Sequence, residues 1–264
     1  TVSQRAAGQL NDTRRSMSRN AERVASGSRI AHAADDTAGA AVAVKLSTRA
    51  RSTRQGIRNA NDGLAMVNMA ESVTHGLTDR LQRMREIAVQ AATGTFADSE
   101  RSLMQKEFQK HLNDVKNTAT RTKFNGMSIT LGEKFSIQVG ADDTTNDRIT
   151  IQMPAHNTVY IGLRTQKIST QDAAKDSLTA IDTEIDRVNK YLGSLGSDTN
   201  RLTSAVQAAI EHESALTAAT SRIEDADYAA DTAEMAALQI KSQAGTAAIA
   251  QANGLARGVI GLIG

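Results

Sequence analysis

One heptad series in the C-terminal half of the chain constrains its fold more than any other feature. Every seventh residue is apolar along this series, which consists of Ile181, Val188, Leu195, Leu202, Ala209, Leu216 and Ile223. A companion series at sevens from Leu178 is also partly apolar, at Leu178, Ile185, Leu192 and Val206. An apolar seam that repeats every seven residues predicts one long helix in a coiled coil or an extended bundle. At 1.5 Å per residue this helix spans roughly 70 Å.

The composition agrees with long helices and a thin core. Aromatic residues make up 3% of the 264 residues, and the sequence contains a single proline, Pro154. Aromatic side chains usually fill the centre of a thick globular core, and proline interrupts helices and central strands. The scarcity of aromatic residues and of proline therefore favours long, uninterrupted helices packed side by side.

Other segments predict further helices around one β-hairpin. Leu10, Met17 and Val24 lie at sevens near the N-terminus, and residues 28–35 form a joint to the next helix. A second helix is predicted through 57–92, and a third begins at a cap formed by Asp98 or Ser99. Two segments in which apolar and polar residues alternate predict a β-hairpin. The apolar residues are Phe135, Ile137 and Val139 on one strand and Ile149, Ile151 and Met153 on the other.

Helix resumes near Thr170, and an Ala-rich amphipathic segment follows from Asp231 through Leu238, Leu255 and Ile260. The predicted fold class is mainly α: long antiparallel helices in an extended bundle or coiled coil, with a small β-hairpin region. We expect a terminal helical domain made of residues 1–37 and 224–264. A core helical bundle of residues 38–223 carries the hairpin at about 129–163.

Charge is distributed unevenly along the sequence. Residues 1–60 contain eleven Lys and Arg against four Asp and Glu, whereas residues 168–264 contain seven against thirteen. A basic head and an acidic tail predict that the two ends meet, within one molecule or between neighbouring molecules. Solvated helix faces are the alternative. The basic segment has no aromatic residue to stack on bases and no recognisable motif, so nucleic acid is not an expected partner.

The sequence offers little for catalysis, cofactors or metals. Without cysteine it cannot form disulfides or thiolate metal sites. No two histidines are spaced as a helical metal pair, and Glu211, His212 and Glu213 fan around a helix. The acidic loop Asp142–Asp147 lacks the glycine and closing glutamate of a calcium loop, which favours an ordinary turn. We therefore predict a protein that is not an enzyme and binds no cofactor. No membrane span and no cleavable signal peptide are recognisable.

Several motifs, in order along nearly the whole chain, resemble those of bacterial flagellins. They are ERVASGSRI (22–30), ADDTAG (34–39), RNANDG (58–63), LQRMREIAVQ (81–90), FNG (124–126), IQVGA (137–141), SRIEDADYA (221–229) and QAN (251–253). The resemblance implies a structural subunit of the flagellar filament that self-assembles through its terminal helices. Only Pro154 to about Thr170 separates the hairpin from the returning helix, so the chain looks like a minimal flagellin without variable outer domains.

The resemblance also implies a location and partners. The protein is expected outside the cell, in the flagellum, after export without a cleavable signal peptide. Its implied partners are other copies of itself, an export chaperone and a filament cap protein. Flagellins of this kind are recognised by a vertebrate Toll-like receptor, and matching the motif assigns that contact to Arg83, Ile87, Gln90 and Glu107. In an alternative, Ile87 faces the bundle core and Arg83 pairs with a neighbouring subunit.

A rival hypothesis is a cell-surface module that uses the same fold to bind an anionic polysaccharide. Four arginines separated by two, three and four residues motivate it, namely Arg49, Arg51, Arg54 and Arg58. The planar guanidinium group of arginine matches carboxylate partners. Pairing of these arginines with the acidic C-terminal segment is the alternative explanation for the patch.

Overall fold

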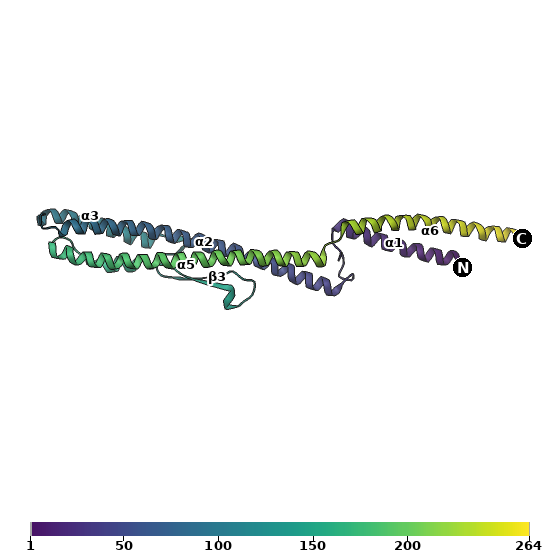
Figure 1. Ribbon diagram of the computed structural model, residues 1–264, viewed down its shortest axis with the longest axis horizontal. Coiled ribbons are helices and arrows are strands. Elements are labelled where there is room, and N and C mark those ends of the chain that lie inside the picture. Colours follow the sequence, from purple (N-terminus) through teal and green to yellow (C-terminus); the bar gives the residue numbers. More distant parts are fainter. Residues whose placement is uncertain (1, 264) are drawn as a thin grey trace. The chain divides into compact units, whose positions relative to one another are not determined.

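The computed structural model describes residues 2–263, with side chains for residues 4–252 and residue 254. Predicted apolar positions from Leu255 onward therefore lie outside the described side chains. The helices are α1 (Val2–Ser26), α2 (Thr37–Ala92), α3 (Asp98–Arg121), α4 (His156–Leu163), α5 (Gln171–Glu224) and α6 (Tyr228–Ile263). The strands are β1 (Lys123–Phe124), β2 (Met127–Ser128), β3 (Lys134–Gln138) and β4 (Arg148–Gln152), with a short 3-10 helix, η1 (Thr145–Asp147), before β4. The predicted fold class is confirmed (Figure 1).

The chain divides into two compact units. Thr1–Ala50 and Ser214–Gly264 form the terminal unit, and Arg51–Glu213 forms the core unit. Both α2 and α5 contribute residues to each unit. The domain boundaries expected near residues 37 and 224, which follow the joints between helices, remain predictions.

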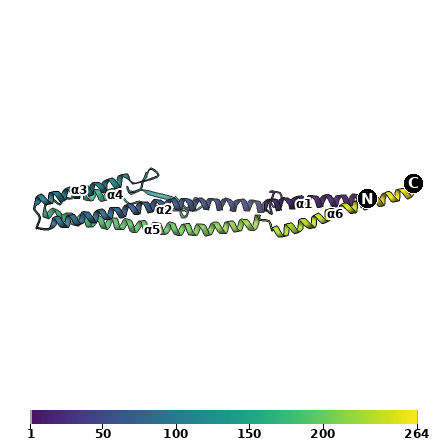
Figure 2. The same ribbon diagram turned by 90° about the horizontal axis from the view of Figure 1, so that it is seen from above.

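In the core unit α2, α3 and α5 lie side by side (Figures 1 and 2). One apolar cluster joins these helices to α4 and includes Leu77, Leu81, Met84, Phe108, Leu112, Val159, Leu163, Ile181 and Val188. A second cluster packs the hairpin against α2 and α5 and includes Val67, Ala70, Ile149, Ile151, Met153, Leu195 and Leu202. The core is therefore long and thin, as the aromatic-poor composition predicts.

The main heptad series of α5 is confirmed as a buried seam from Ile181 to Leu202 and again at Leu216, whereas Ala209 and Ile223 are half-buried. Ile181, Val188, Leu195 and Leu202 are all at most 1% exposed. The companion series from Leu178 is half-buried, and Leu178, Ile185 and Val206 pack against the edges of the two apolar clusters. The buried row lies one residue earlier and is polar, at Ser177, Glu184 and Asp198. This face of α5 is covered because α4 packs on it: a Cβ atom on Gly162 would lie 2.2 Å from Glu184 Oε1.

The β-hairpin has the predicted pairing. β3 and β4 are antiparallel, with Phe135 opposite Ile151 and Ile137 opposite Ile149. The hairpin packs closely on α2, because a Cβ atom on Gly56 would lie 2.2 Å from the carbonyl oxygen of Val139. One turn later the side chain of Asn59 donates a hydrogen bond to the Gln138 carbonyl, at 3.1 Å. A glycine and an asparagine on one face of α2 thus position the edge of the hairpin.

One helix start agrees with the predictions and one does not. The predicted joint at residues 28–35 is followed by α2, which begins at Thr37, and Asp36 Oδ1 accepts a hydrogen bond from Gly39 N at 2.8 Å. The first turns of α2 leave Val42 and Val44 exposed, which is why the apolar stripe predicts this helix only from residue 57. The N-cap of α3 is Ala97, not Asp98 or Ser99. Glu100 accepts a hydrogen bond from the Ala97 backbone there, which is half of a capping box.

The segment between the hairpin and α5 contains a helix that the sequence does not predict. α4 buries His156, Val159 and Leu163 in the core unit. Eight residues are too few for a helical period to stand out from an apolar run. What was expected to be a connection is therefore a packed layer on α5.

Candidate assembly surface and recognition sites

The pairing of α1 with α6 brings the two ends of the sequence together in the terminal unit (Figure 1). The residues that face the partner helix are only half-buried, at Leu10, Met17, Val24, Met235 and Ile249. Among the described side chains of these two helices, Asn20 and Leu238 alone are buried. Two helices cannot cover a stripe of this width by themselves, so the pair leaves apolar surface in contact with solvent.

A groove of about 710 Å³ runs between the two helices. Its lining is mostly small or apolar and includes Ala6, Leu10, Thr13, Leu238, Gly245 and Ala248. Exposed apolar side chains continue along α6, where Tyr228 is 60% and Ile240 67% exposed. An exposed apolar stripe with a polar border is typical of a surface that binds another protein.

Charge on the helix pair is not neutralised within one chain. α1 has exposed arginines at Arg5, Arg14, Arg15 and Arg19. The described side chains of α1 and α6 form no ion pair with each other, although α6 begins with acidic residues. Within α1, Arg15 Nη1 lies 3.9 Å from Asp12 Oδ1. Exposed Arg5, Arg14 and Arg19 are accessible to a neighbouring molecule, which is one of the two arrangements expected for the basic head and the acidic tail.

The four residues assigned to receptor contact do not share one environment. Arg83 Nη2 lies 3.0 Å from Glu107 Oε1, and its Nη1 lies 3.0 Å from Glu86 Oε2. The hydrogen bonds that Arg83 donates to Glu86 and then to Glu107 raise the pKa of Arg83 above its usual value. Gln90 is exposed on the same helix. Ile87, however, is 3% exposed and belongs to the core cluster of α2, α3 and α5. The exposed surface is therefore made by Arg83, Glu107 and Gln90.

The arginine patch proposed for an anionic polymer lies on α2, and all four side chains are exposed. Three of them, Arg49, Arg54 and Arg58, have partners within the chain. Arg54 Nε donates to Glu213 Oε1 at 2.7 Å, and Arg58 donates to Gln55 Oε1. The first pair joins the basic N-terminal half to the acidic C-terminal half, which is the alternative explanation for the patch. No observation favours a polysaccharide.

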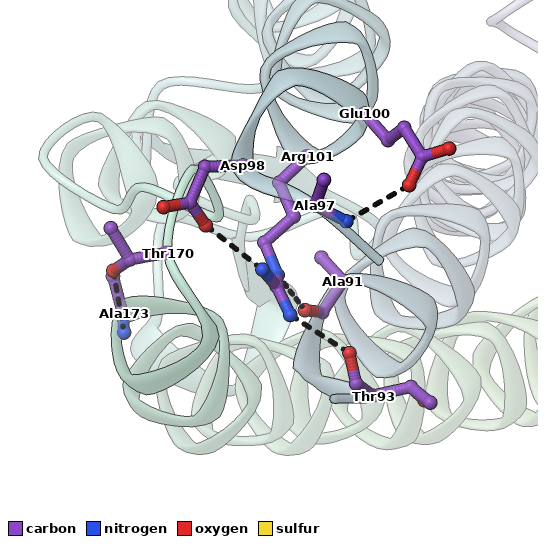
Figure 3. A network of polar contacts seen from close by, with 8 residues as sticks. All are labelled: Ala91, Thr93, Ala97, Asp98, Glu100, Arg101, Thr170 and Ala173. Carbon is purple, nitrogen blue, oxygen red and sulfur yellow. Dashed lines mark hydrogen bonds and ion pairs between the residues drawn. The ribbon is translucent and has the colours of Figure 1, made fainter. Parts of the chain in front are cut away.

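Sequence reasoning missed one buried cation, at the turn between α2 and α3. Arg101 is 5% exposed. Its Nε donates to the Ala91 carbonyl at 2.8 Å, its Nη2 to the Thr93 carbonyl at 2.9 Å, and its Nη1 contacts Asp98 Oδ1 at 2.9 Å (Figure 3). The guanidinium thus satisfies carbonyl groups that the end of α2 leaves open, where a positive charge is also favourable. The available signal was Asp98 three residues before Arg101 at a helix start.

A second missed feature is a buried histidine. His156 is fully buried, and its Nε2 lies 3.0 Å from Thr74 Oγ1. Thr74 donates its own hydroxyl proton to the Ala70 carbonyl, at 2.6 Å. His156 must therefore carry its proton on Nε2 and donate it to Thr74. Nδ1 is buried with no hydrogen-bond partner among the described residues. Burial lowers the pKa of His156 to about 4.

Across the part of the chain with described side chains, no group of three or more His, Asp or Glu residues is arranged to hold a metal ion. None of the helices described has both the length and the apolarity that crossing a membrane requires.

Comparisons of the sequence with family models and with curated proteins both find bacterial flagellins. The family model "Bacterial flagellin N-terminal helical region" matches residues 1–134, and "Bacterial flagellin C-terminal helical region" matches residues 178–263. The chain is 32% identical to flagellin FlaB2 of Treponema pallidum (strain Nichols) over 271 residues, covering 96% of this chain and 94% of the relative. It is 31% identical to the flagellar filament 33 kDa core protein of Treponema phagedenis, with the same coverage.

Among solved structures, the crystal structure of Bacillus cereus flagellin aligns with a TM-score of 0.52 and 25% identity. The alignment covers 57% of this chain and 88% of that one. The sequence alignments with the two Treponema relatives thus cover 96% of this chain, whereas the structural alignment covers a little more than half.

Proposed function

This chain belongs to the bacterial flagellin family, and from that membership and the geometry of its terminal helices we propose that it is a structural subunit of the flagellar filament. Assembly proceeds through α1 and α6. The observation that carries this mechanism is that the apolar stripe between the two helices is only half-buried in one copy. Neighbouring copies in a filament can cover the exposed half, and the resulting burial offsets the entropy of ordering the helices.

Electron microscopy of the purified full-length chain tests the proposal. The wild-type protein is expected to form filaments, and Leu238→Asp is expected to abolish them, because a charge would enter the buried seam. Leu238→Met preserves volume and apolarity at the same position and should still assemble. Folded wild-type protein that forms no filament under any polymerising condition contradicts the proposal.

The partners outside the filament follow from family membership. The chain leaves the cell by flagellar export, meets an export chaperone before secretion and adds to the filament beneath a cap protein. Its lack of cysteine suits this route, since no disulfide can form in an unfolded chain during passage. Secretion of the chain by a strain that lacks its own flagellin, and loss of secretion when flagellar export is disabled, is the expected result.

Recognition by a Toll-like receptor is a second function for the monomer. The arrangement that favours it is the exposed surface of Arg83, Glu107 and Gln90, in which an arginine with several free donors joins two helices. Arginines of this kind are frequent interface hot spots. In a receptor reporter assay Arg83→Ala should lose signal, whereas Lys110→Ala on the exposed face of α3 should not. Ile87→Ala should act through stability, because Ile87 belongs to the core.

A further inference from the structure

Two distant sequence motifs meet at the base of the terminal helix pair and form a set of backbone hydrogen bonds. We call residues 27–29 and 223–226 the base clamp. Arg29 N donates to the Glu224 carbonyl at 2.7 Å, and Ala226 N donates to the Gly27 carbonyl at 3.0 Å. These bonds pair Ser28 with Asp225 in an isolated antiparallel bridge.

Side chains reinforce the base clamp. Ser28 Oγ lies 3.1 Å from the Glu224 carbonyl, and Arg29 Nη2 donates to the Ile223 carbonyl at 2.8 Å. Both carbonyl groups belong to the last turn of α5, where helix carbonyls lack intrahelical partners. The base clamp therefore connects the end of α1 to the start of α6 through carbonyl groups at the end of α5 that would otherwise lack a hydrogen-bond donor.

Gly27 makes this geometry possible. Its φ is +69°, a conformation that residues with a side chain rarely adopt. No atom lies within 4 Å of the position that a Cβ atom would occupy, so the requirement for glycine is conformational and not steric. Gly27 N also closes α1 by donating to the Arg23 carbonyl at 2.8 Å.

The seam between α1 and α6 does not by itself define how the helices align. Leu10, Met17 and Val24 are spaced at sevens, and so are Leu238 and Gly245 on α6. When α6 slides by seven residues so that Met17 meets Gly245, Leu10 meets Ala252 and Val24 meets Leu238, and each apolar position on α1 again has an uncharged partner. In the observed alignment Leu10 faces Gly245, where a Cβ atom would lie 4.0 Å from the Cβ atom of Leu10.

We propose that the base clamp sets the register in which α1 and α6 pair. The groove between the helices is lined by residues of both, so only one register presents it correctly to a second copy of this chain. The role in assembly rests on the proposed filament function. The register itself is a property of the single chain and is tested separately.

Engineered disulfides can report the register, because the natural sequence has no cysteine. The pair Leu10→Cys with Gly245→Cys reports the observed register, since a Cβ separation of 4.0 Å suits a disulfide. The pair Met17→Cys with Gly245→Cys reports a register shifted by one heptad. In the otherwise unchanged chain, kept unassembled, the first pair should oxidise at least about tenfold faster than the second.

Gly27→Val should reduce this rate ratio to about one, because valine disfavours a φ of +69° and breaks the bond to Ala226 N. Gly8→Val is the matched control, because Gly8 lies within α1 and also has no neighbour within 4 Å of a Cβ atom. A double variant, Ser28→Ala with Arg29→Ala, removes the side-chain bonds without backbone strain and should lower the ratio in the same direction.

An unchanged ratio in both base-clamp variants overturns the proposal. Equal slowing of the two disulfide pairs also overturns it, because the base clamp would then stabilise the helices without choosing their register. Filament formation gives a second readout. Oxidised Leu10→Cys with Gly245→Cys should restore assembly to Gly27→Val, and reduction should abolish it again. Failure of the wild-type chain to form filaments would count against the filament function and leave the register result intact.

Discussion

Arg101 Nε lies 2.8 Å from the carbonyl oxygen of Ala91, so one buried guanidinium closes the C-terminal end of α2. The same guanidinium donates hydrogen bonds to the Thr93 carbonyl and to Asp98 Oδ1, and these contacts stabilise the turn between α2 and α3 (Figure 3). Replacing Arg101 leaves the carbonyl of the buried Ala91 without this donor, whereas Thr93 and Asp98 are exposed. The core unit thus depends on a polar contact at one end as well as on its apolar seam.

We predict that Arg101→Leu destabilises the core unit by about 3 kcal/mol, because hydrogen bonds to a buried charged group are lost and open carbonyls remain. Urea unfolding followed by circular dichroism measures the change. Lys110→Leu, on an exposed position of the same helix, should shift the midpoint little. Equal midpoints for Arg101→Leu and the wild-type chain would show that the turn does not need this contact.

Gly56→Ala and Gly193→Ala should have opposite effects on stability. A Cβ atom on Gly56 would lie 2.2 Å from the Val139 carbonyl oxygen, so the hairpin must move away from α2 at a cost of about 1–3 kcal/mol. Gly193 lies within α5 with no atom within 4 Å of such a Cβ atom. Alanine there should stabilise by about 0.5–1 kcal/mol through helix propensity. Thermal melting distinguishes the two, and a shared sign contradicts the packing described for the hairpin.

Leu202→Asp should destabilise the core unit by about 4 kcal/mol, because Leu202 is fully buried beside the hairpin and an aspartate there would be unpaired. Leu103→Asp is the control, since Leu103 is 65% exposed. If both variants melt at the same temperature, the seam of α5 has been placed on the wrong face.

His156 makes stability depend on pH. Its pKa is lowered from 6.5 to about 4 by burial, so the unfolded chain binds a proton more readily than the folded chain. The contribution of neutral His156 to the free energy of unfolding is fully present above pH 6.5. As the pH falls toward 4 this contribution is lost, by about 3 kcal/mol in total. Burial raises the pKa of Glu184, which acts in the opposite direction, because the folded state then binds the proton more tightly.

Comparison with His156→Gln isolates the histidine, because glutamine can still donate to Thr74 and does not titrate. The urea midpoint of the wild-type chain should fall more steeply than that of the variant between pH 7 and about pH 4.5. Parallel pH dependences would mean that His156 is protonated without penalty in the folded state.

Residues with a regular repeat made much of the fold predictable. The series from Ile181 and the alternation through Phe135 and Ile151 locate α5 and the hairpin, because apolar periodicity follows directly from which face is buried. The seam's second row was not predictable, because Glu184 and Asp198 are buried through packing of α4 and the hairpin, which come from elsewhere in the sequence. Arg101 and His156 were missed for the same reason, since tertiary contacts with Ala91 and Thr74 define their roles.

The candidate surfaces also divide into features that the sequence predicts and features that only tertiary packing defines. Helical spacing placed Arg83 and Gln90 on one helix, and the motif brought Glu107 to them, as the 3.0 Å contact between Arg83 and Glu107 illustrates. The inward orientation of Ile87 was an open alternative, because spacing along a helix does not tell which side faces the bundle. Only the packed structure resolves such a choice.

The central claim is that α1 and α6 are incompletely buried in one copy and complete their core when copies assemble. Hydrogen exchange of the backbone amides of residues 4–26 and 228–252, in monomer and in filament, tests it most directly. The account predicts rapid exchange of these amides in the monomer, slow exchange in the filament, and slow exchange of the α5 seam around Leu195 in both. Terminal helices that are already protected in the monomer, and gain no protection in the filament, would contradict it.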